Sequence, residues 1–201
     1  MKNVLLIVDP QNDFITGTLS VAGAKEKMLK LAAYIDEVGD EYDYICVTMD
    51  THPIDHCSFV SFDGPWPTHC VSDTNGWRVP EYLSDVLEPR NPGFYYKGTH
   101  PDYEEYSIFD NEDDGELLTA LLNDLRKHDD DVYVDVCGIA GDYCVLETLI
   151  GLRGFIADDH ISVLTEFTAS IDGGNSLNCF IELNGINEID DASSHMKEYV
   201  Y

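Results

Sequence analysis

Basic residues are scarce in this chain of 201 residues: 11 lysines and arginines stand against 39 aspartates and glutamates, which gives a formal net charge of −28. A surface this acidic repels polyanions, which argues against nucleic acid and anionic membrane surfaces as partners. The same field hinders an anionic substrate and tolerates a neutral or cationic one. We therefore expect no nucleic acid and no membrane partner.

Long apolar runs are also missing. The run near the start, Val4 to Val8, is far shorter than the roughly 18 residues that a membrane-spanning helix needs. It leads directly into Asp9-Pro10 without a small-residue cleavage site, which disfavours a signal peptide. The six cysteines are scattered and not arranged in a dense framework, which favours reduced thiols. We expect a cytoplasmic protein.

Apolar residues occur at an ordinary level, with 44% hydrophobic residues and 11% aromatic ones. A chain of this length and composition can bury a core without disulfide or metal staples. The sequence contains no internal repeat and no sign of a second core. Residues 1–201 are therefore predicted to form a single domain.

Buried strands and amphipathic helices alternate along the chain. Short apolar runs predict strands at Lys2 to Val8, Tyr44 to Met49, Phe94 to Lys97, Val132 to Gly138 and Ile161 to Leu164. Helical spacing of apolar residues predicts helices at Ala24 to Val38, Asp114 to Arg126, Ala140 to about Arg153 with Asp142 as its N-cap, and Ser176 to Leu183. The proline-rich stretch from Cys57 to Pro92 is expected to be mostly loop. The pattern predicts a three-layer α/β/α, Rossmann-like fold with a mostly parallel central sheet.

Three reactive side chains stand at predicted strand ends. Asp9 follows the first strand, Lys97 ends the Phe94 strand, and Cys144 opens the helix after the Val132 strand. The carboxyl ends of parallel strands meet at one edge of a sheet, so we expect the three to converge. Backbone amides and the helix dipole there favour a thiolate, Asp9 can accept the thiol proton, and Lys97 can stabilise the anions formed.

A second group of side chains has the spacing of metal ligands. Asp50 and His52 are two apart on an extended segment and can point the same way, and His56 and His69 follow in the proline-rich loop. Imidazole nitrogens and a carboxylate suit zinc, iron or manganese better than calcium. The spacing predicts one divalent metal ion in an open site, with zinc as the first choice and iron or manganese as alternatives.

Together these segments resemble the nicotinamidases, also called pyrazinamidases, within the isochorismatase-like cysteine hydrolase family. The resemblance spans about three-quarters of the chain, in the expected order. The matching stretches are Leu6 to Phe14, Asp50 to Phe59, Trp66 to Val71, Lys97 to Thr99, Tyr106 to Asn111 and Gly138 to Val145.

The resemblance implies an isochorismatase-like hydrolase fold and a role for each matched residue. The family's triad falls on Asp9, Lys97 and Cys144. Its metal ligands fall on Asp50, His52 and His69, and His56 takes a position that ligates metal only in some members. A cis peptide before Ala140 would aim the Ala140 and Cys144 amides at one point as an oxyanion hole. Phe14, Trp66 and Tyr106 match the aromatic positions that clamp the pyridine ring.

The implied reaction is hydrolysis of nicotinamide to nicotinate and ammonia through a cysteine thioester, as in NAD salvage. Gly141 departs from the family pattern, where threonine is common. Cys144 argues against the isochorismatase branch, which lacks this nucleophile. Two alternatives stay open: an amidase for another small carboxamide such as pyrazinamide, and a non-catalytic metal-binding module closed by Cys57 or Cys70. A homo-oligomer is also left open.

Overall fold

The computed structural model describes residues 1–128 and 131–195. These residues form a parallel sheet of six strands in the spatial order β3-β2-β1-β4-β5-β6. The strands are β1 (Lys2–Val8), β2 (Tyr44–Asp50), β3 (Gly93–Lys97), β4 (Val132–Ile139), β5 (Ile161–Ala169) and β6 (Asn187–Ile189). Each parallel pairing requires the chain to cross back over a face of the sheet, and helices make these crossings.

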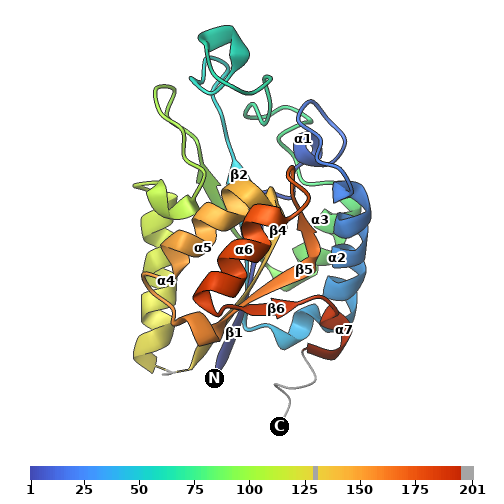
Figure 1. Cartoon of the computed structure of the whole chain (residues 1–201), viewed down its shortest axis with the longest axis vertical. Helices are drawn as coiled ribbons and strands as arrows, with labels where there is room; N and C mark the ends of the chain where they lie inside the picture. Colours follow the sequence, from blue (N-terminus) through green and yellow to red (C-terminus); the bar gives the residue numbers. More distant parts are fainter. Residues whose placement is uncertain (129–130, 196–201) are drawn as a thin grey trace.

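Helices cover both faces of the sheet (Figure 1). One face carries α1 (Asn12–Ile15), α2 (Ala24–Val38), α3 (Glu81–Leu87) and α7 (Ala192–His195). The other face carries α4 (Asp114–His128), α5 (Leu146–Leu152) and α6 (Asn175–Asn184). The predicted three-layer α/β/α fold is therefore confirmed. Among the described residues, no helix combines the length and apolar character needed to cross a membrane.

Helix α2 shows how the layers are held together. Met28, Leu31 and Ile35 recur at helical spacing and are fully buried. They belong to the same core cluster as Leu5 and Ile7, which alternate along β1 and face this side of the sheet. Fully burying one such side chain stabilises a fold by about 1.5 to 3 kcal/mol. The spacing of apolar residues thus decides which side of the helix meets the sheet.

Most predicted elements are present, and the differences are local. Strand β1 and helix α2 have the predicted bounds, β5 runs further than predicted, and the short α1, β6 and α7 were not predicted. The N-cap prediction was wrong: Asp142 lies inside a π-helical turn, Gly141–Val145, whose N-cap is Ala140. The Asp142 carboxylate instead accepts the N–H groups of Ile171 and Asp172.

The strand order places the candidate site. The chain moves from β1 to β2 on one side and from β4 to β5 on the other, so the connections diverge between β1 and β4. Ligands bind beyond the carboxyl ends of the strands at such a switch point. Asp9 follows β1, and the turn that carries Cys144 follows β4. The long segment between β2 and α3 extends beyond this edge (Figure 1).

Candidate active site

Lys97 is the centre of a buried charged cluster. It is fully buried, and its Nζ lies 2.8 Å from Asp9 Oδ2 and 3.6 Å from Cys144 Sγ. The same ammonium donates to Asp50 Oδ1. Asp9, Asp50 and Cys144 offer atoms that all lie within 4.8 Å of one another. The structure therefore brings together the three side chains expected at the sheet edge, and it adds Asp50 as a second carboxylate partner of Lys97.

Local backbone geometry explains how these residues reach one another. Asp9 leaves β1 with a left-handed backbone, φ 48°, and its Oδ1 accepts the hydroxyl proton of Thr48 on β2 at 2.7 Å. Lys97 is the last residue of β3, where it is in register with Asp50, the last residue of β2. Residues far apart in the sequence therefore converge because their strands are neighbours and end at the same level.

The protonation of the thiol differs from the sequence-based expectation. Burial raises the pKa of Cys144 well above its ordinary value, and the Asp9 and Asp50 carboxylates raise it further, against the opposing effect of Lys97. Burial in the folded protein thus opposes the shift towards thiolate that the backbone amides and the helix dipole favour. Burial also raises the pKa of Asp9, although Lys97 opposes the shift. A carboxylate with a raised pKa is a better proton acceptor near neutral pH.

Asp50, His52 and His69 form the group that could hold a metal ion. Their candidate ligand atoms lie within 4.8 Å of one another, with Asp50 Oδ2 3.5 Å from His52 Nε2 and 3.9 Å from His69 Nε2. The Nδ1 atoms face backbone carbonyls, that of Gly98 at 2.9 Å for His52 and that of Pro67 at 2.8 Å for His69. Such bonds fix the ring orientation and leave Nε2 for a metal.

The geometry of Asp50, His52 and His69 is suited to binding a divalent cation. His52 Nε2 is buried and has no hydrogen-bond partner, which is costly unless another group satisfies it. Burial lowers the pKa of His52, but the Asp50 carboxylate more than offsets this and raises it, so in the free protein a proton competes for that nitrogen. Burial likewise opposes ionisation of Asp50, yet Lys97 and His52 hold its pKa well below the usual range.

His56, a possible ligand by the resemblance, lies beside this group and forms a second candidate ligand group with His52 and Glu104. Its ring stacks on that of His52, with centroids 4.0 Å apart. Its Nδ1 is 2.7 Å from Ser58 Oγ and also accepts the Ser58 backbone N–H at 3.3 Å, so Nε2 carries the proton and donates to the Tyr103 carbonyl at 3.1 Å. Burial and the neighbouring His52 lower the pKa of His56 to about 4. In this arrangement both ring nitrogens of His56 are engaged by protein groups.

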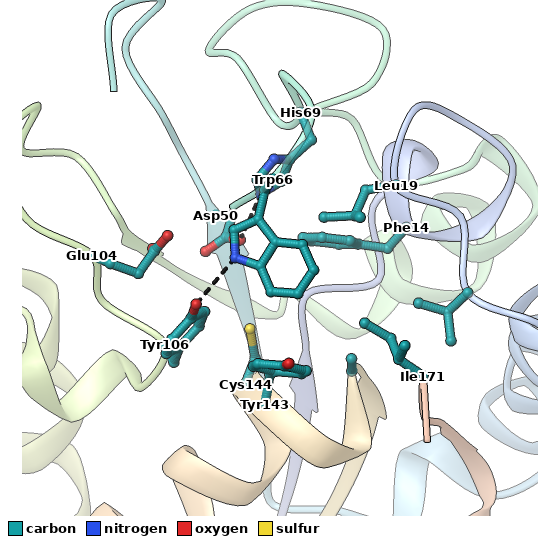
Figure 2. A pocket seen from close by; sticks show the side chains of 12 residues that line it. Phe14, Leu19, Asp50, Trp66, His69, Glu104, Tyr106, Tyr143, Cys144 and Ile171 are labelled. Carbon is teal, nitrogen blue, oxygen red and sulfur yellow. Dashed lines mark hydrogen bonds and ion pairs between the residues drawn. The ribbon is translucent and has the colours of Figure 1, made fainter. Parts of the chain in front are cut away.

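A pocket of about 370 Å³, measured with its open mouth, lies between the thiol and the metal-ligand group. Figure 2 shows the Cys144 sulfur pointing into it, with Phe14 on one side and Tyr106 on the other. Trp66 donates its Nε1–H to Tyr106 OH at 3.0 Å and meets Tyr143 edge-on at 5.1 Å. The three aromatic residues expected around the ring are thus all in the lining.

Sequence reasoning missed several residues of the lining. The additional residues are Leu19, Val21, Glu104, Tyr143 and Ile171. Tyr143 could have been suspected from its place beside Cys144. Ile171 has no comparable signal, because it enters from the β5–α6 loop and only the tertiary structure brings that loop to the pocket.

The turn that carries Cys144 has the expected backbone. The Ile139–Ala140 peptide bond is cis, and Ala140 and Cys144 both line the pocket. At Gly141 a side chain would collide with Ser170 Oγ and press on Thr168 and Leu177. Gly141 stands where threonine is common in the family, and here the Ser170 hydroxyl occupies the space that a side chain at this position would need.

Two buried residues outside the predicted set support the metal-ligand group. Gln11 Nε2 donates to the carbonyls of Asp50 and Trp77, both at 2.8 Å, and its Oε1 accepts the Asp50 N–H at 2.8 Å. Glu105 accepts the N–H of Gly98, whose carbonyl faces His52. Gln11 lies within a stretch that matches the family, which is the signal that could have found it.

Known proteins agree with the resemblance in sequence and in fold. The nicotinamidase/pyrazinamidase of Mycobacterium tuberculosis is 35% identical over 185 residues, which cover 89% of this chain and 92% of that protein. The pyrazinamidase of Pyrococcus horikoshii in complex with zinc has a TM-score of 0.75 at 29% identity, covering 95% of this chain and all of the other. The yeast nicotinamidase bound to the inhibitor nicotinaldehyde has a TM-score of 0.80 at 26% identity, covering 94% and 100%.

No protein-family model matches the chain. Identity of 35% over most of both sequences nevertheless establishes the relationship, and an isochorismatase-like hydrolase from Alkaliphilus metalliredigens shares the fold. The chain belongs to the nicotinamidase/pyrazinamidase family.

Proposed function

We propose that this protein hydrolyses nicotinamide to nicotinate and ammonia, as part of NAD salvage, through a thioester on Cys144. The observation that carries the proposal is the contact of Cys144 Sγ with Lys97 Nζ at 3.6 Å and of that ammonium with Asp9 at 2.8 Å, at the wall of an aromatic pocket. The substrate named for its relatives is nicotinamide or pyrazinamide. Nicotinamide is uncharged, which suits the acidic protein.

Binding places the carboxamide over the sulfur. Phe14, Trp66 and Tyr106 would clamp the pyridine ring, and Asp50, His52 and His69 would hold a divalent ion beside the pocket. When bound, such an ion supplies a positively charged anchor for the ring nitrogen. Zinc is the metal we propose, since the zinc complex of the Pyrococcus relative supports it and the donor set suits it. The binding energy of the ring is thus used to orient the carboxamide for attack by Cys144.

The chemical steps use the side chains around the thiol. Asp9 takes the Cys144 proton as the sulfur attacks the carboxamide carbon, and Lys97 stabilises the charges that result. The backbone N–H groups of Ala140 and Cys144 donate to the oxyanion. Asp9 then returns the proton to the departing ammonia, and in the second half it takes a proton from the water that hydrolyses the thioester. Asp9 gives this proton to the departing sulfur, so that the free thiol and nicotinic acid are left, and the acid ionises to nicotinate.

The test is ammonia release by the metal-loaded protein. Cys144→Ala is expected to abolish it while the metal content and the melting temperature stay near those of the wild type. Cys179→Ala, which removes an exposed thiol on α6, is the matched control and should stay fully active. Turnover retained in Cys144→Ala would remove the nucleophile from the proposal.

A panel of amides separates nicotinamide from the same-fold alternative. Nicotinamide, pyrazinamide and benzamide differ in their ring nitrogens, and benzamide offers none for an anchor. We expect turnover to fall steeply for benzamide. A preference for an aliphatic amide would instead favour a different small carboxamide as the substrate.

The geometry disfavours a closed, non-catalytic metal site. Among the described residues, neither Cys57 nor Cys70 joins Asp50, His52 and His69 in the candidate ligand group. The Cys70 backbone is held by the Asp13 carboxylate, at 2.8 Å. A structural zinc site has four protein ligands, whereas a catalytic one keeps a position open. A cytoplasmic location stays a prediction of the sequence, and the oligomeric state stays open.

A further inference from the structure

One apolar wall of the pocket stands out by its exposure. Ile171 lies in the loop between β5 and α6 and lines the pocket although its side chain is 51% exposed. The other aliphatic residues of that side, Leu19 and Val21, are partly or fully buried. Figure 2 shows Ile171 on the same side of the pocket as Phe14 and Leu19, away from Tyr106. A bound ring would cover this otherwise solvated side chain.

The position of Ile171 is set by the turn that carries Cys144. The Asp142 carboxylate accepts the Ile171 N–H at its Oδ1 and the Asp172 N–H at its Oδ2, both at 2.9 Å. Asp172 in turn accepts the N–H groups of Gly174 and Ser176, both at 2.8 Å, at the start of α6. One carboxylate therefore ties the loop to the turn, and a second ties it to the helix.

The Ser170 side chain adds a third contact. Ser170 precedes Ile171, and its Oγ occupies the space that a side chain at Gly141 would need. The loop therefore packs on the turn at Gly141, which precedes Tyr143 by two residues and the nucleophile Cys144 by three. A shift of either segment would move Ile171 relative to Cys144.

We propose that Ile171 contacts the bound substrate and limits the size of the ring substituents that the pocket accepts, and that Asp142 is the positioning residue that holds it there. This rests on the proposed hydrolysis of nicotinamide. An apolar side chain against one edge of the ring leaves room for a hydrogen substituent but overlaps with a methyl group. When the fit is close, the contact between the side chain and the ring adds binding energy.

The experiment compares kcat and KM for nicotinamide and for each of its ring-methylated isomers. Ile171→Ala should raise KM for nicotinamide by about fivefold with little change in kcat, since a half-exposed isoleucine gains roughly half of its burial energy on binding. It should also raise kcat/KM for at least one methylated isomer, relative to nicotinamide, by about tenfold. Ile150→Ala, on α5 and 47% exposed outside the pocket, is the matched control and should change neither ratio.

Variants of the attachment test the positioning role. Asp142→Ala should reproduce the selectivity change of Ile171→Ala, and Asp142→Asn, which keeps one acceptor oxygen, should reproduce it only in part. If all methylated isomers keep their wild-type ratios in Ile171→Ala, the inference is overturned while nicotinamide hydrolysis stands. A wild-type protein that releases no ammonia from nicotinamide would overturn the proposed function, and this inference with it.

Discussion

Replacing Lys97 by methionine is the most informative single perturbation. Methionine keeps much of the side-chain volume and removes the ammonium that lies between Asp9 and Asp50. The lysine and Asp9 are fully buried, and Asp50 is 4% exposed, so water cannot replace the lost charge. The variant would leave two buried carboxylates without their shared cation.

The expected loss of stability follows from that burial. Removing one partner of a buried ion pair costs about 3 to 5 kcal/mol, because the remaining charge stays desolvated. For a domain of this size each kcal/mol lowers the melting temperature by roughly 2 to 4 °C, so we expect a fall of about 6 to 20 °C. The loss of the cation should also abolish turnover.

The assay is thermal unfolding with a chelator present, so that no bound cation compensates for the missing ammonium, followed by ammonia release from the metal-loaded protein. Lys2→Met is the matched control: Lys2 also pairs with an aspartate, Asp43, at 2.6 Å, but both side chains are partly exposed. Exposed pairs contribute about 0 to 1 kcal/mol, so this variant should melt within about 4 °C of the wild type.

Acidity provides a further check on the same variant. Without Lys97, burial and mutual repulsion should raise the pKa of Asp9 and Asp50 in the folded protein above their unfolded values. The folded state then binds protons more tightly than the unfolded one, and the deficit in stability should grow as pH rises from about 5 to about 8. A variant that melts like Lys2→Met and still releases ammonia would refute the reasoning about the buried cluster.

Three other predictions concern the metal-ligand group and the charge of the whole chain. His52→Ala removes one of the three candidate metal ligands. Losing a residue that only supports a ligand weakens metal affinity by roughly 10 to 100-fold, so losing the ligand itself should weaken it further. Unchanged metal stoichiometry in this variant would remove His52 from the ligand set. Gln11→Met removes the hydrogen-bond partner of three backbone groups, and each unpaired group costs about 1 to 3 kcal/mol of stability. The variant should therefore lower both the urea concentration at the unfolding midpoint and the metal affinity. An unchanged midpoint would contradict this. With a net charge of −28, the protein should gain stability in NaCl as the salt screens self-repulsion, whereas a neutral solute of equal osmolarity should not match the gain.

The elements of the fold could be predicted because their signals are local. The buried run of β1 and the helical spacing of α2 are complete within their own residues, and both have the predicted bounds. The elements that were missed are short: α1 and α7 have four residues each and β6 has three. Elements of that length carry too few positions for a period to be recognised, and their neighbours in space stabilise them.

The candidate site divides in the same way. Asp9 and Cys144 follow strands and Lys97 ends one, so the rule that parallel strands end at one edge is enough to bring them together. The residue types and spacing of Asp50, His52 and His69 also indicate a group of metal ligands. These are properties of the order of residues, and the sequence by itself determined them.

Tertiary structure decided the rest. Burial in the folded core raises the pKa of the Cys144 thiol, and no local pattern measures that desolvation. Asp142, a plausible helix cap by its position, binds a loop almost thirty residues away, and so brings Ile171 to the pocket. Hydrogen bonds and burial depend on distances in space, which the order of residues specifies only after the whole chain has packed.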